Sequence, residues 1–331
     1  MNSGMDSDMN SKPNSNNNNN SGESNGHHLH AGHSLSERTI RALANAHLGA
    51  FDVLRVLEVA LEEDLHTGFD VTSVATIAPT SLSVADVVIR KDGVFAGAPL
   101  LAAALEWFIG DGVQYKLMAA DGDRVKRGDV VATINAPTIE LLTIERTMLN
   151  LICRASGTAT LTRAWVDAVV GTNAKIRDTR KTTPGMRAIE KYAVRCGGGV
   201  NHRIGLYDAV LIKDNHVLAA GGVGAALDLV KARFADRPEM VIQTEIDRLD
   251  QLDEAIDHGA HQILLDNMSP ALMTEAVTRT RAKAPNILLE ASGGLSLETA
   301  ASVAATGVDF IAVGALTHSA PILDIALDFK R

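Results

Sequence analysis

The segment from Ile176 to His216 concentrates positive charge in an otherwise acidic chain. It contains eight lysine and arginine residues against four acidic ones, a net charge of +4, whereas the whole chain of 331 residues carries −9. A positive segment of this size indicates a site for several anionic groups at once. Nucleic acid fits poorly, because aromatic residues make up only 4% of the chain and the basic residues are interrupted by three glycines and an apolar strand.

Five side chains of this segment are the candidates for an anion pocket: Arg180, Lys181, His202, Arg203 and Lys213. Arginine offers a planar fork that matches a carboxylate, and lysine offers a compact charge for phosphate. The alternative is charge scattered over surface loops. It does not explain why these residues lie at the ends of predicted strands and beside three consecutive glycines, where a ligand can approach the backbone closely.

Two carboxylates, Glu245 and Asp266, end two consecutive predicted strands, so we expect them side by side. Oxygen ligands of this kind suit Mg²⁺ that arrives with a phosphorylated substrate, or the hydroxyls of a ribose. A structural ion-pair network with Lys213 is the alternative. The basic segment nearby favours the functional interpretation.

Two glycine-containing loops follow the last two predicted strands. They comprise Ser292, Gly293 and Gly294, and then Gly314, Ala315 and Leu316. Small side chains expose backbone N–H groups, and a following helix N-terminus adds positive potential, so both loops suit a phosphate. Either loop alone could be a simple turn, but the pair at the end of a barrel-like pattern favours phosphate binding.

The composition is that of a globular protein with one large or two moderate α/β domains, at 46% hydrophobic and 21% charged residues. No uninterrupted apolar stretch is long enough to span a membrane. Two cysteines, Cys153 and Cys196, cannot form a disulfide framework and favour the cytoplasm, and Cys196 is interpreted as a small buried residue rather than a reactive thiol. Residues 1–33, rich in Asn, Ser and His, are predicted to be a disordered, solvated tail rather than a metal-binding segment.

Residues 34–148 are predicted to form a small mixed α+β domain. A capping-box spacing from Ser34 to Glu37 opens the first helix, and apolar periodicity locates the other elements. The predicted helices cover about 34–48, 52–63 and 99–108, and the predicted strands cover about 82–90, 113–118 and 125–134. From 138 to 170 the pattern is helical, with a predicted break at Ser156–Thr158.

In the second predicted domain, residues 149–317, short apolar strands alternate with helical stretches. The strands centre near Ile176, Leu211, Ile242, Leu264, Leu288 and Ile311. The later spacings of about 21 to 24 residues match a short βαβ crossover. Polar or glycine residues follow every strand, and active sites of α/β barrels lie at that end of the strands. Six parallel strands with intervening helices fit either an open doubly wound sheet or a barrel. The polar strand ends favour an α/β barrel, complete or incomplete in its ring of strands.

The motifs together resemble the quinolinate phosphoribosyltransferase family, from about Phe51 to the C-terminus. The resemblance rests on Arg177–Gly185 (RDTRKTTPG), Gly197–Arg203 (GGGVNHR), Leu211–His216 (LIKDNH), Glu145–Arg146, Glu245, Leu264–Asn267 (LLDN), Ala291–Gly294 (ASGG) and Val313–Leu316 (VGAL). Only the Asn- and His-rich tail departs from the family pattern.

The resemblance implies an open-faced α+β sandwich ahead of an incomplete α/β barrel, with a last helix, 318–331, that returns to the first domain. It implies a homodimer in which Arg146 reaches the partner's active site, while further assembly of dimers is left open. The implied reaction converts quinolinate and phosphoribosyl pyrophosphate, with Mg²⁺, to nicotinate mononucleotide, pyrophosphate and CO₂, an entry into NAD synthesis.

The family's residue roles are carried over position by position. Arg146, Arg180, His202 and Arg203 would hold the quinolinate carboxylates, Lys181 and Lys213 would contact carboxylate or pyrophosphate oxygens, Glu245 and Asp266 would bind ribose hydroxyls and Mg²⁺, and the two glycine loops would take the 5′-phosphate. Thr179 belongs to the same substrate-binding set. Lys181, Lys213, Glu245 and Asp266 are the residues implied in catalysis.

Three rival interpretations fit the sequence less well. A paralogous phosphoribosyltransferase of the same fold would use a different acceptor, but the set Arg146, Arg180, His202 and Arg203 favours a dicarboxylate. A non-catalytic ligand-binding protein would be expected to lack Glu245, Asp266 or Lys213, and all three are present. The orotate-type transferases are disfavoured because their paired-acid strand and Thr-Gly-Gly-Thr loop are absent.

Overall fold

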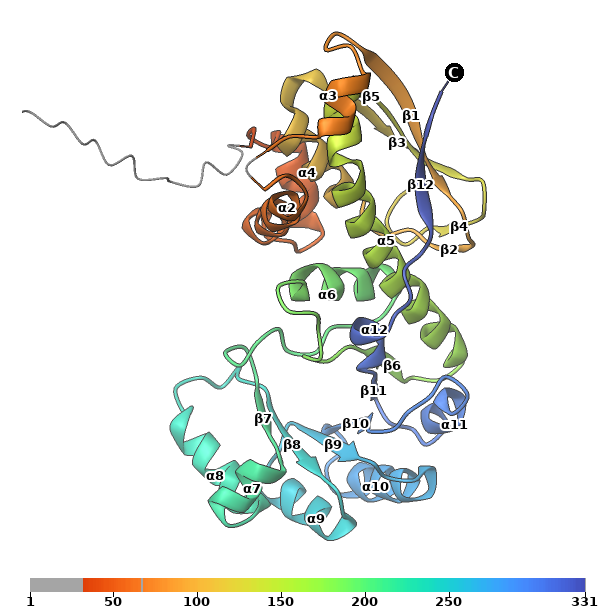
Figure 1. Cartoon of the computed structure of the whole chain (residues 1–331). Helices are drawn as coiled ribbons and strands as arrows, with labels where there is room; N and C mark the ends of the chain where they lie inside the picture. Colours follow the sequence, from red (N-terminus) through yellow and green to blue (C-terminus); the bar gives the residue numbers. More distant parts are fainter. Residues whose placement is uncertain (1–31, 67, 331) are drawn as a thin grey trace, which may run out of the picture.

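The computed structural model describes residues 32–66 and 68–330, which form two large sheets joined by one long helix, together with a small two-stranded sheet (Figure 1). Most of the predicted tail, residues 1–31, lies outside the described residues, as does most of its histidine cluster. None of the described helices is both long and apolar enough to cross a membrane.

The N-terminal half packs helices against one side of a four-stranded antiparallel sheet, whose order is β12-β1-β5-β3. Its helices are α1 (Glu37–Asn45), α2 (Ala50–Leu65), α3 (Val71–Thr76) and α4 (Ala98–Ile109), and its strands from this half are β1 (Leu82–Ile89), β3 (Gln114–Leu117) and β5 (Val130–Pro137), beside a small pair β2 (Gly93–Val94) and β4 (Arg124–Val125). The N-cap of the first helix lies two residues later than predicted. Ser36 is the N-cap and accepts a hydrogen bond from the Thr39 N–H.

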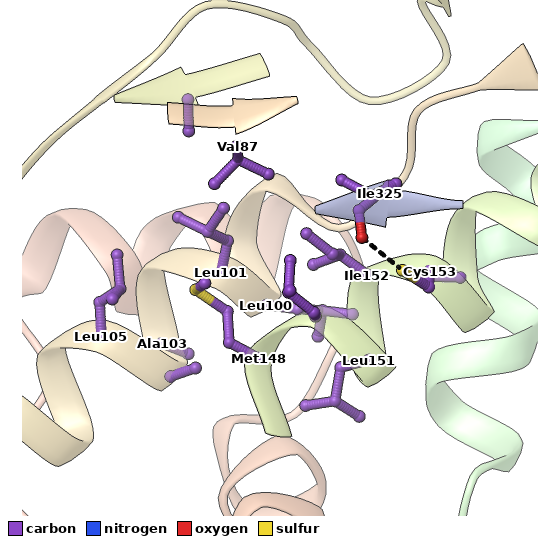
Figure 2. Close-up of a cluster of buried hydrophobic side chains, with 14 of the residues drawn as sticks. Val87, Leu100, Leu101, Ala103, Leu105, Met148, Leu151, Ile152, Cys153 and Ile325 are labelled. Atoms are coloured by element: carbon purple, nitrogen blue, oxygen red, sulfur yellow. Dashed lines mark hydrogen bonds between the residues drawn. The ribbon is translucent and has the colours of Figure 1, made fainter. Parts of the chain in front are cut away.

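The core of this half forms where α4 and the long helix α5 (Thr138–Ala168) meet under the sheet. Figure 2 shows Leu101 and Met148 packed beneath Val87, all fully buried, and the Cys153 thiol donating to the Ile325 carbonyl at 3.7 Å. Burial of side chains of this size contributes about 1.5–3 kcal/mol each. The helices and the sheet therefore stabilise each other as one layer pair.

The predicted break at Ser156–Thr158 is wrong, because α5 runs unbroken for 31 residues. Gly157 and Ser156 serve packing instead. A Cβ on Gly157 would lie 2.1 Å from the Pro321 carbonyl oxygen, and the Ser156 hydroxyl bridges the backbone N–H and C=O of Ala96 at 3.0 Å each. The predicted boundary between 148 and 149 consequently falls inside this helix.

The predicted C-terminal helix over 318–331 is also wrong. A short helix, α12 (Ala315–His318), is followed by strand β12 (Ile325–Phe329), which pairs antiparallel with β1 from Ile89↔Ile325 to Ala85↔Phe329. Apolar Ile325 and Leu327 alternate with Ala326 and Asp328, a period of two that suits a strand at a sheet edge. The chain does return to the first domain, but as a strand (Figure 1).

The second half is a six-stranded parallel sheet in the order β6-β11-β10-β9-β8-β7. Its strands are β6 (Lys175–Arg177), β7 (Val210–Ile212), β8 (Ile242–Ile246), β9 (Gln262–Asp266), β10 (Leu288–Ser292) and β11 (Phe310–Ala312), and its helices are α6 (Arg187–Cys196), α7 (Asp214–Ala220), α8 (Val223–Arg233), α9 (Leu249–Asp257), α10 (Pro270–Lys283) and α11 (Ala300–Ala304). The first two strands in sequence, β6 and β7, occupy opposite edges, so the ring stays open between them. The prediction of an incomplete α/β barrel preceded by an α+β sandwich is confirmed.

Candidate active site

A cavity of about 600 Å³, here called the site cavity, lies at the carboxyl ends of the parallel strands. It is lined by Thr179, Arg180, Lys181, His202, Arg203, Leu211, Lys213, Glu245, Leu264, Asp266, Asn267, Glu290, Ser292, Gly293, Gly294 and Ala312. Parallel strands bring residues that are distant in sequence to one edge of the sheet. Most of the predicted site residues therefore line one cavity.

The acidic side of the cavity comes from β8 and β9, which are neighbours in the sheet as expected. Glu245 Oε2 accepts a hydrogen bond from Lys213 Nζ at 2.6 Å, so the predicted alternative of an ion pair with Lys213 is also present. Asp266 Oδ2 accepts from Asn267 Nδ2 at 2.7 Å. Both carboxylates face the cavity. The charge of Glu245 is paired with Lys213, whereas Asp266 is bonded to an uncharged amide.

The cationic side contains two guanidinium groups from different loops. The Nε atoms of Arg180 and Arg203 are buried and have no hydrogen-bond partner within 32–66 and 68–330. Burial lowers the pKa of Arg203, and the nearby Arg180 charge lowers it further. Buried donors without partners are costly, so this pair of cations is suited to an anionic ligand.

His202 lines the cavity, but both ring nitrogens bond within the protein. Its Nδ1 accepts from the Arg203 backbone N–H at 2.7 Å, which places the ring proton on Nε2, 2.9 Å from Gln243 Oε1. Burial, with a contribution from Arg177, lowers the pKa of His202 to about 3. The imidazole is therefore neutral at pH 7, and it fixes the backbone beside Arg203.

Glu290 is a cavity residue that the sequence analysis missed. Its side chain is 1% exposed, its Oε2 pairs with Arg177 at 2.7 Å, and its Oε1 lies 3.5 Å from His202 Nε2. Burial raises the pKa of Glu290 against the opposing effect of Arg177. An acidic residue inside the apolar strand of sequence LLEAS was the available signal, since an ionisable group in a buried strand needs a partner.

The two glycine loops have different positions. Gly293 and Gly294 line the cavity with φ of +90° and +59°, and a Cβ on Gly293 would lie 2.2 Å from Asn267 Oδ1. The second loop does not line it. Gly314 lies just outside, where a Cβ would meet Lys181 Cδ at 3.1 Å, Ala315 begins α12, and the Leu316 side chain is fully buried.

Arg146 lies outside the site cavity of its own chain. It projects from α5 with a side chain that is 58% exposed, and its nearest acidic partner is Glu145 at 3.7 Å. In the loop after β6, by contrast, Thr179 and Lys181 face the cavity, and the Thr179 hydroxyl accepts from the Lys181 N–H at 3.0 Å.

These features define a phosphoribosyltransferase-type anion site on an open α/β barrel, and comparisons with known proteins agree. The model of the N-terminal domain of quinolinate phosphoribosyl transferase matches residues 70–156, and that of the C-terminal domain matches residues 158–328. The chain belongs to the quinolinate phosphoribosyltransferase family.

Individual relatives support the same assignment. The chain is 52% identical over 281 residues to the nicotinate-nucleotide pyrophosphorylase (carboxylating) of Mycobacterium leprae, which covers 84% of this chain and 98% of that relative. It is 44% identical to a probable enzyme of that name from Bacillus subtilis, over 80% of this chain and 89% of the relative. The solved structure of the nicotinate-nucleotide pyrophosphorylase from Francisella tularensis matches with a TM-score of 0.80 and 35% identity, over 86% of this chain and 98% of that one.

Proposed function

We propose that the site cavity performs the reaction for which the family is named. Quinolinate and phosphoribosyl pyrophosphate react to give nicotinate mononucleotide, pyrophosphate and CO₂. The observation that carries this proposal is that the buried, unpartnered Nε atoms of Arg180 and Arg203 belong to one cavity with Glu245 and Asp266. A dicarboxylate complements the two arginines, and a phosphorylated ribose complements the acids and the glycine loop.

In this proposal the substrates occupy opposite sides of the cavity. Arg180 and Arg203 hold the two quinolinate carboxylates, and His202 acts through the Arg203 backbone rather than by a direct bond. Lys181 and Lys213 contact carboxylate or pyrophosphate oxygens. Ser292, Gly293 and Gly294 receive the 5′-phosphate, with Gly314, Ala315 and Leu316 contributing backbone from behind Lys181.

The first step is displacement at the anomeric carbon. The lone pair of the quinolinate nitrogen forms the new C–N bond as the bond to pyrophosphate breaks and its electrons leave with the oxygen. Glu245 and Asp266 stabilise positive charge on the ribose as it becomes oxocarbenium-like, and cationic groups stabilise the departing pyrophosphate. Catalysis then depends on positioning and electrostatic stabilisation, without a covalent enzyme nucleophile.

Decarboxylation follows ribosylation, because a quaternised ring nitrogen stabilises the electron pair left at C2. The bond between C2 and its carboxylate breaks, CO₂ leaves, and a proton replaces it at C2. The ring retains the carboxylate at C3, which remains available to an arginine. The order of steps therefore follows from the chemistry of the pyridinium.

Mg²⁺ is part of the proposal. The oxygen donors Glu245 and Asp266 are of the type that Mg²⁺ prefers, and no three His, Cys, Asp or Glu side chains within 32–66 and 68–330 converge as a metal cluster. This donor set fits an ion that is shared with the substrate, held by Glu245 and Asp266 on the protein side. When bound, Mg²⁺ would neutralise charge on the pyrophosphate.

The proposal includes a homodimer with a shared site, because exposed Arg146 lies outside the cavity of its own chain. Mixing inactive Arg146→Ala subunits with inactive Lys213→Ala subunits should restore part of the activity, since some heterodimer sites would carry both native residues. No recovery, after subunit exchange has been verified, would count against Arg146 acting in the partner's site. The cytoplasmic location inferred from the two cysteines remains part of the proposal.

The deciding experiment incubates the purified protein with quinolinate, phosphoribosyl pyrophosphate and Mg²⁺ and detects nicotinate mononucleotide by mass. A parallel reaction contains nicotinate in place of quinolinate. Product from quinolinate alone is expected. Product from nicotinate alone, or none from either acceptor in a folded protein that binds phosphoribosyl pyrophosphate, would reject the assigned acceptor.

A further inference from the structure

The ion pair between Lys191 and Asp178 is the most deeply buried of those in the described part of the chain. Lys191 Nζ lies 2.6 Å from Asp178 Oδ1, and the two side chains are 1% and 0% exposed. Neither residue lines the site cavity. Burial raises the pKa of Asp178, while Lys191 opposes that rise. Because desolvation can cancel the attraction within such a pair, stability alone is a weak explanation for it.

The pair ties together the two loops that supply the cavity's arginines. Asp178 precedes Arg180 by two residues, and its Oδ1 also accepts from the His202 backbone N–H at 2.7 Å. Lys191 Nζ donates to the His202 carbonyl at 3.0 Å. The pair thereby fixes both the N–H and the C=O of His202, the residue directly before Arg203, close to the start of the loop that contains Arg180.

Further residues on the same side of helix α6 as Lys191 also bond to the two loops. Arg187 and Arg195 lie four residues before and after Lys191, a spacing that puts all three side chains on the same side of a helix. Arg187 donates to the Thr182 hydroxyl at 3.0 Å and to the Ile204 carbonyl at 3.2 Å, and Arg195 donates to Asn201 Oδ1. This side of α6 therefore contacts both loops through residues that do not line the cavity themselves.

Two arginines that face one cavity repel each other, so their separation must be imposed by the surrounding structure. We propose that Lys191 and Asp178 are positioning residues for the reaction, which hold Arg180 and Arg203 at the separation that a pyridine dicarboxylate requires. This inference rests on the proposed function. It predicts a defect in quinolinate binding rather than in phosphoribosyl pyrophosphate binding, because the acidic side of the cavity is built on other strands.

The test compares Lys191→Met, Asp178→Asn and the double variant by Tm and by the KM for each substrate. Each single variant leaves a buried charge without its partner, so Tm should fall and the quinolinate KM should rise. The neutral double variant should recover most of the Tm. Its quinolinate KM should nevertheless stay at least about 10-fold above wild type, with the phosphoribosyl pyrophosphate KM within about 2-fold, since small displacements of binding groups are costly.

A double variant that recovers both Tm and quinolinate KM would show that the pair only stabilises the fold, and equal rises in both KM values would also overturn the proposal. The control is a second, less buried ion pair, changed as Arg281→Met with Asp309→Asn. That pair, at 2.7 Å, lies at the amino end of β11, away from the cavity, and its loss should lower Tm without changing either KM.

Wild-type turnover is measured first, so failure of the proposed function remains distinguishable. If wild type makes no nicotinate mononucleotide, the same variants are compared by calorimetric titration with quinolinate. Wild-type binding that the double variant weakens at least 10-fold would still support positioning. Equal binding by both proteins, or no binding by wild type, would reject it.

Discussion

Two cavities of nearly equal size differ in how their polar groups are satisfied. The site cavity, about 600 Å³, is lined by Arg180 and Arg203, whose buried Nε atoms have no partner among the described residues. The other, about 620 Å³ and here called the N-terminal cavity, lies between α1, α4 and the end of α6 and has Ala42, Pro99 and Leu117 in its wall. There the Tyr192 hydroxyl donates to Asp121, which also accepts from the backbone N–H of Ala98 at 2.9 Å. Volume alone does not distinguish the two cavities, whereas two buried guanidinium Nε atoms without partners lie in the site cavity only.

The largest expected effect is on the site cavity. Arg203→Ala should raise the KM for quinolinate by about 10- to 150-fold, because a charge-assisted hydrogen bond to a carboxylate contributes about 1.5–3 kcal/mol. The KM for phosphoribosyl pyrophosphate should change much less. Steady-state kinetics with each substrate varied in turn measure both, and exposed Arg237→Ala is the control. Equal losses for both substrates would contradict the assignment.

The neutral imidazole beside Arg203 predicts a pH effect on stability. Burial lowers the pKa of His202 from 6.5 to about 3, so as the pH falls the unfolded chain binds a proton before the folded chain does. The stability that the neutral ring contributes is therefore complete above pH 6.5 and is lost as the pH falls toward 3. Between pH 7 and 5 the loss is about 2 kcal/mol. Urea unfolding at both pH values should show His202→Gln losing less stability than wild type. An equal loss would mean that His202 is not held neutral.

A smaller effect is expected in the N-terminal cavity. Tyr192→Phe removes a buried hydroxyl that donates to Asp121 and accepts from the Gly97 N–H at 2.9 Å. The free energy of unfolding should fall by about 1–3 kcal/mol, because Asp121 and Gly97 lose a partner. Neither KM should move by more than about 2-fold, since Tyr192 does not contact the site cavity. A selective rise in one KM would remove the functional contrast between the two cavities.

The smallest effect on activity is expected at Cys196, also in the wall of the N-terminal cavity. Burial raises the pKa of this thiol to about 12, so little thiolate exists at pH 8. Iodoacetamide should react far more slowly with the folded protein than with the urea-unfolded one, as followed by mass spectrometry. Cys196→Ala should leave both KM values unchanged. Rapid labelling of the folded protein would contradict the interpretation of Cys196 as a structural residue.

Local pattern sufficed for the parts of the site that depend on strand ends. Glu245, Asp266 and Gly293 each end or follow a parallel strand, and parallel pairing brings such positions to one edge whatever the intervening helices do. The positive charge of the segment after β6 was likewise visible as composition. The six parallel strands were predictable because short apolar runs in a βαβ rhythm have few alternative arrangements.

Other features required the tertiary structure because their reasons lie in contacts between distant segments. The sequence suggested that Gly157 breaks the helix, whereas in the structure it allows the segment at Pro321 to approach the helix closely. The alternating end of the chain became a strand because the edge of β1 was available to it. Arg146 had no local signal for its predicted role, and only the structure showed that it lies outside the site cavity of its own chain.

The amino-acid sequence by itself determined which charges this protein brings to its ligand and at which strand ends they lie. Only the tertiary structure decided which of their groups are paired, such as Lys191 with Asp178 and Glu290 with Arg177, and which stay unpaired, such as the Nε atoms of Arg180 and Arg203. The physical reason is that charge and periodicity are local properties. Desolvation and hydrogen-bond satisfaction depend on which segments exclude water from one another.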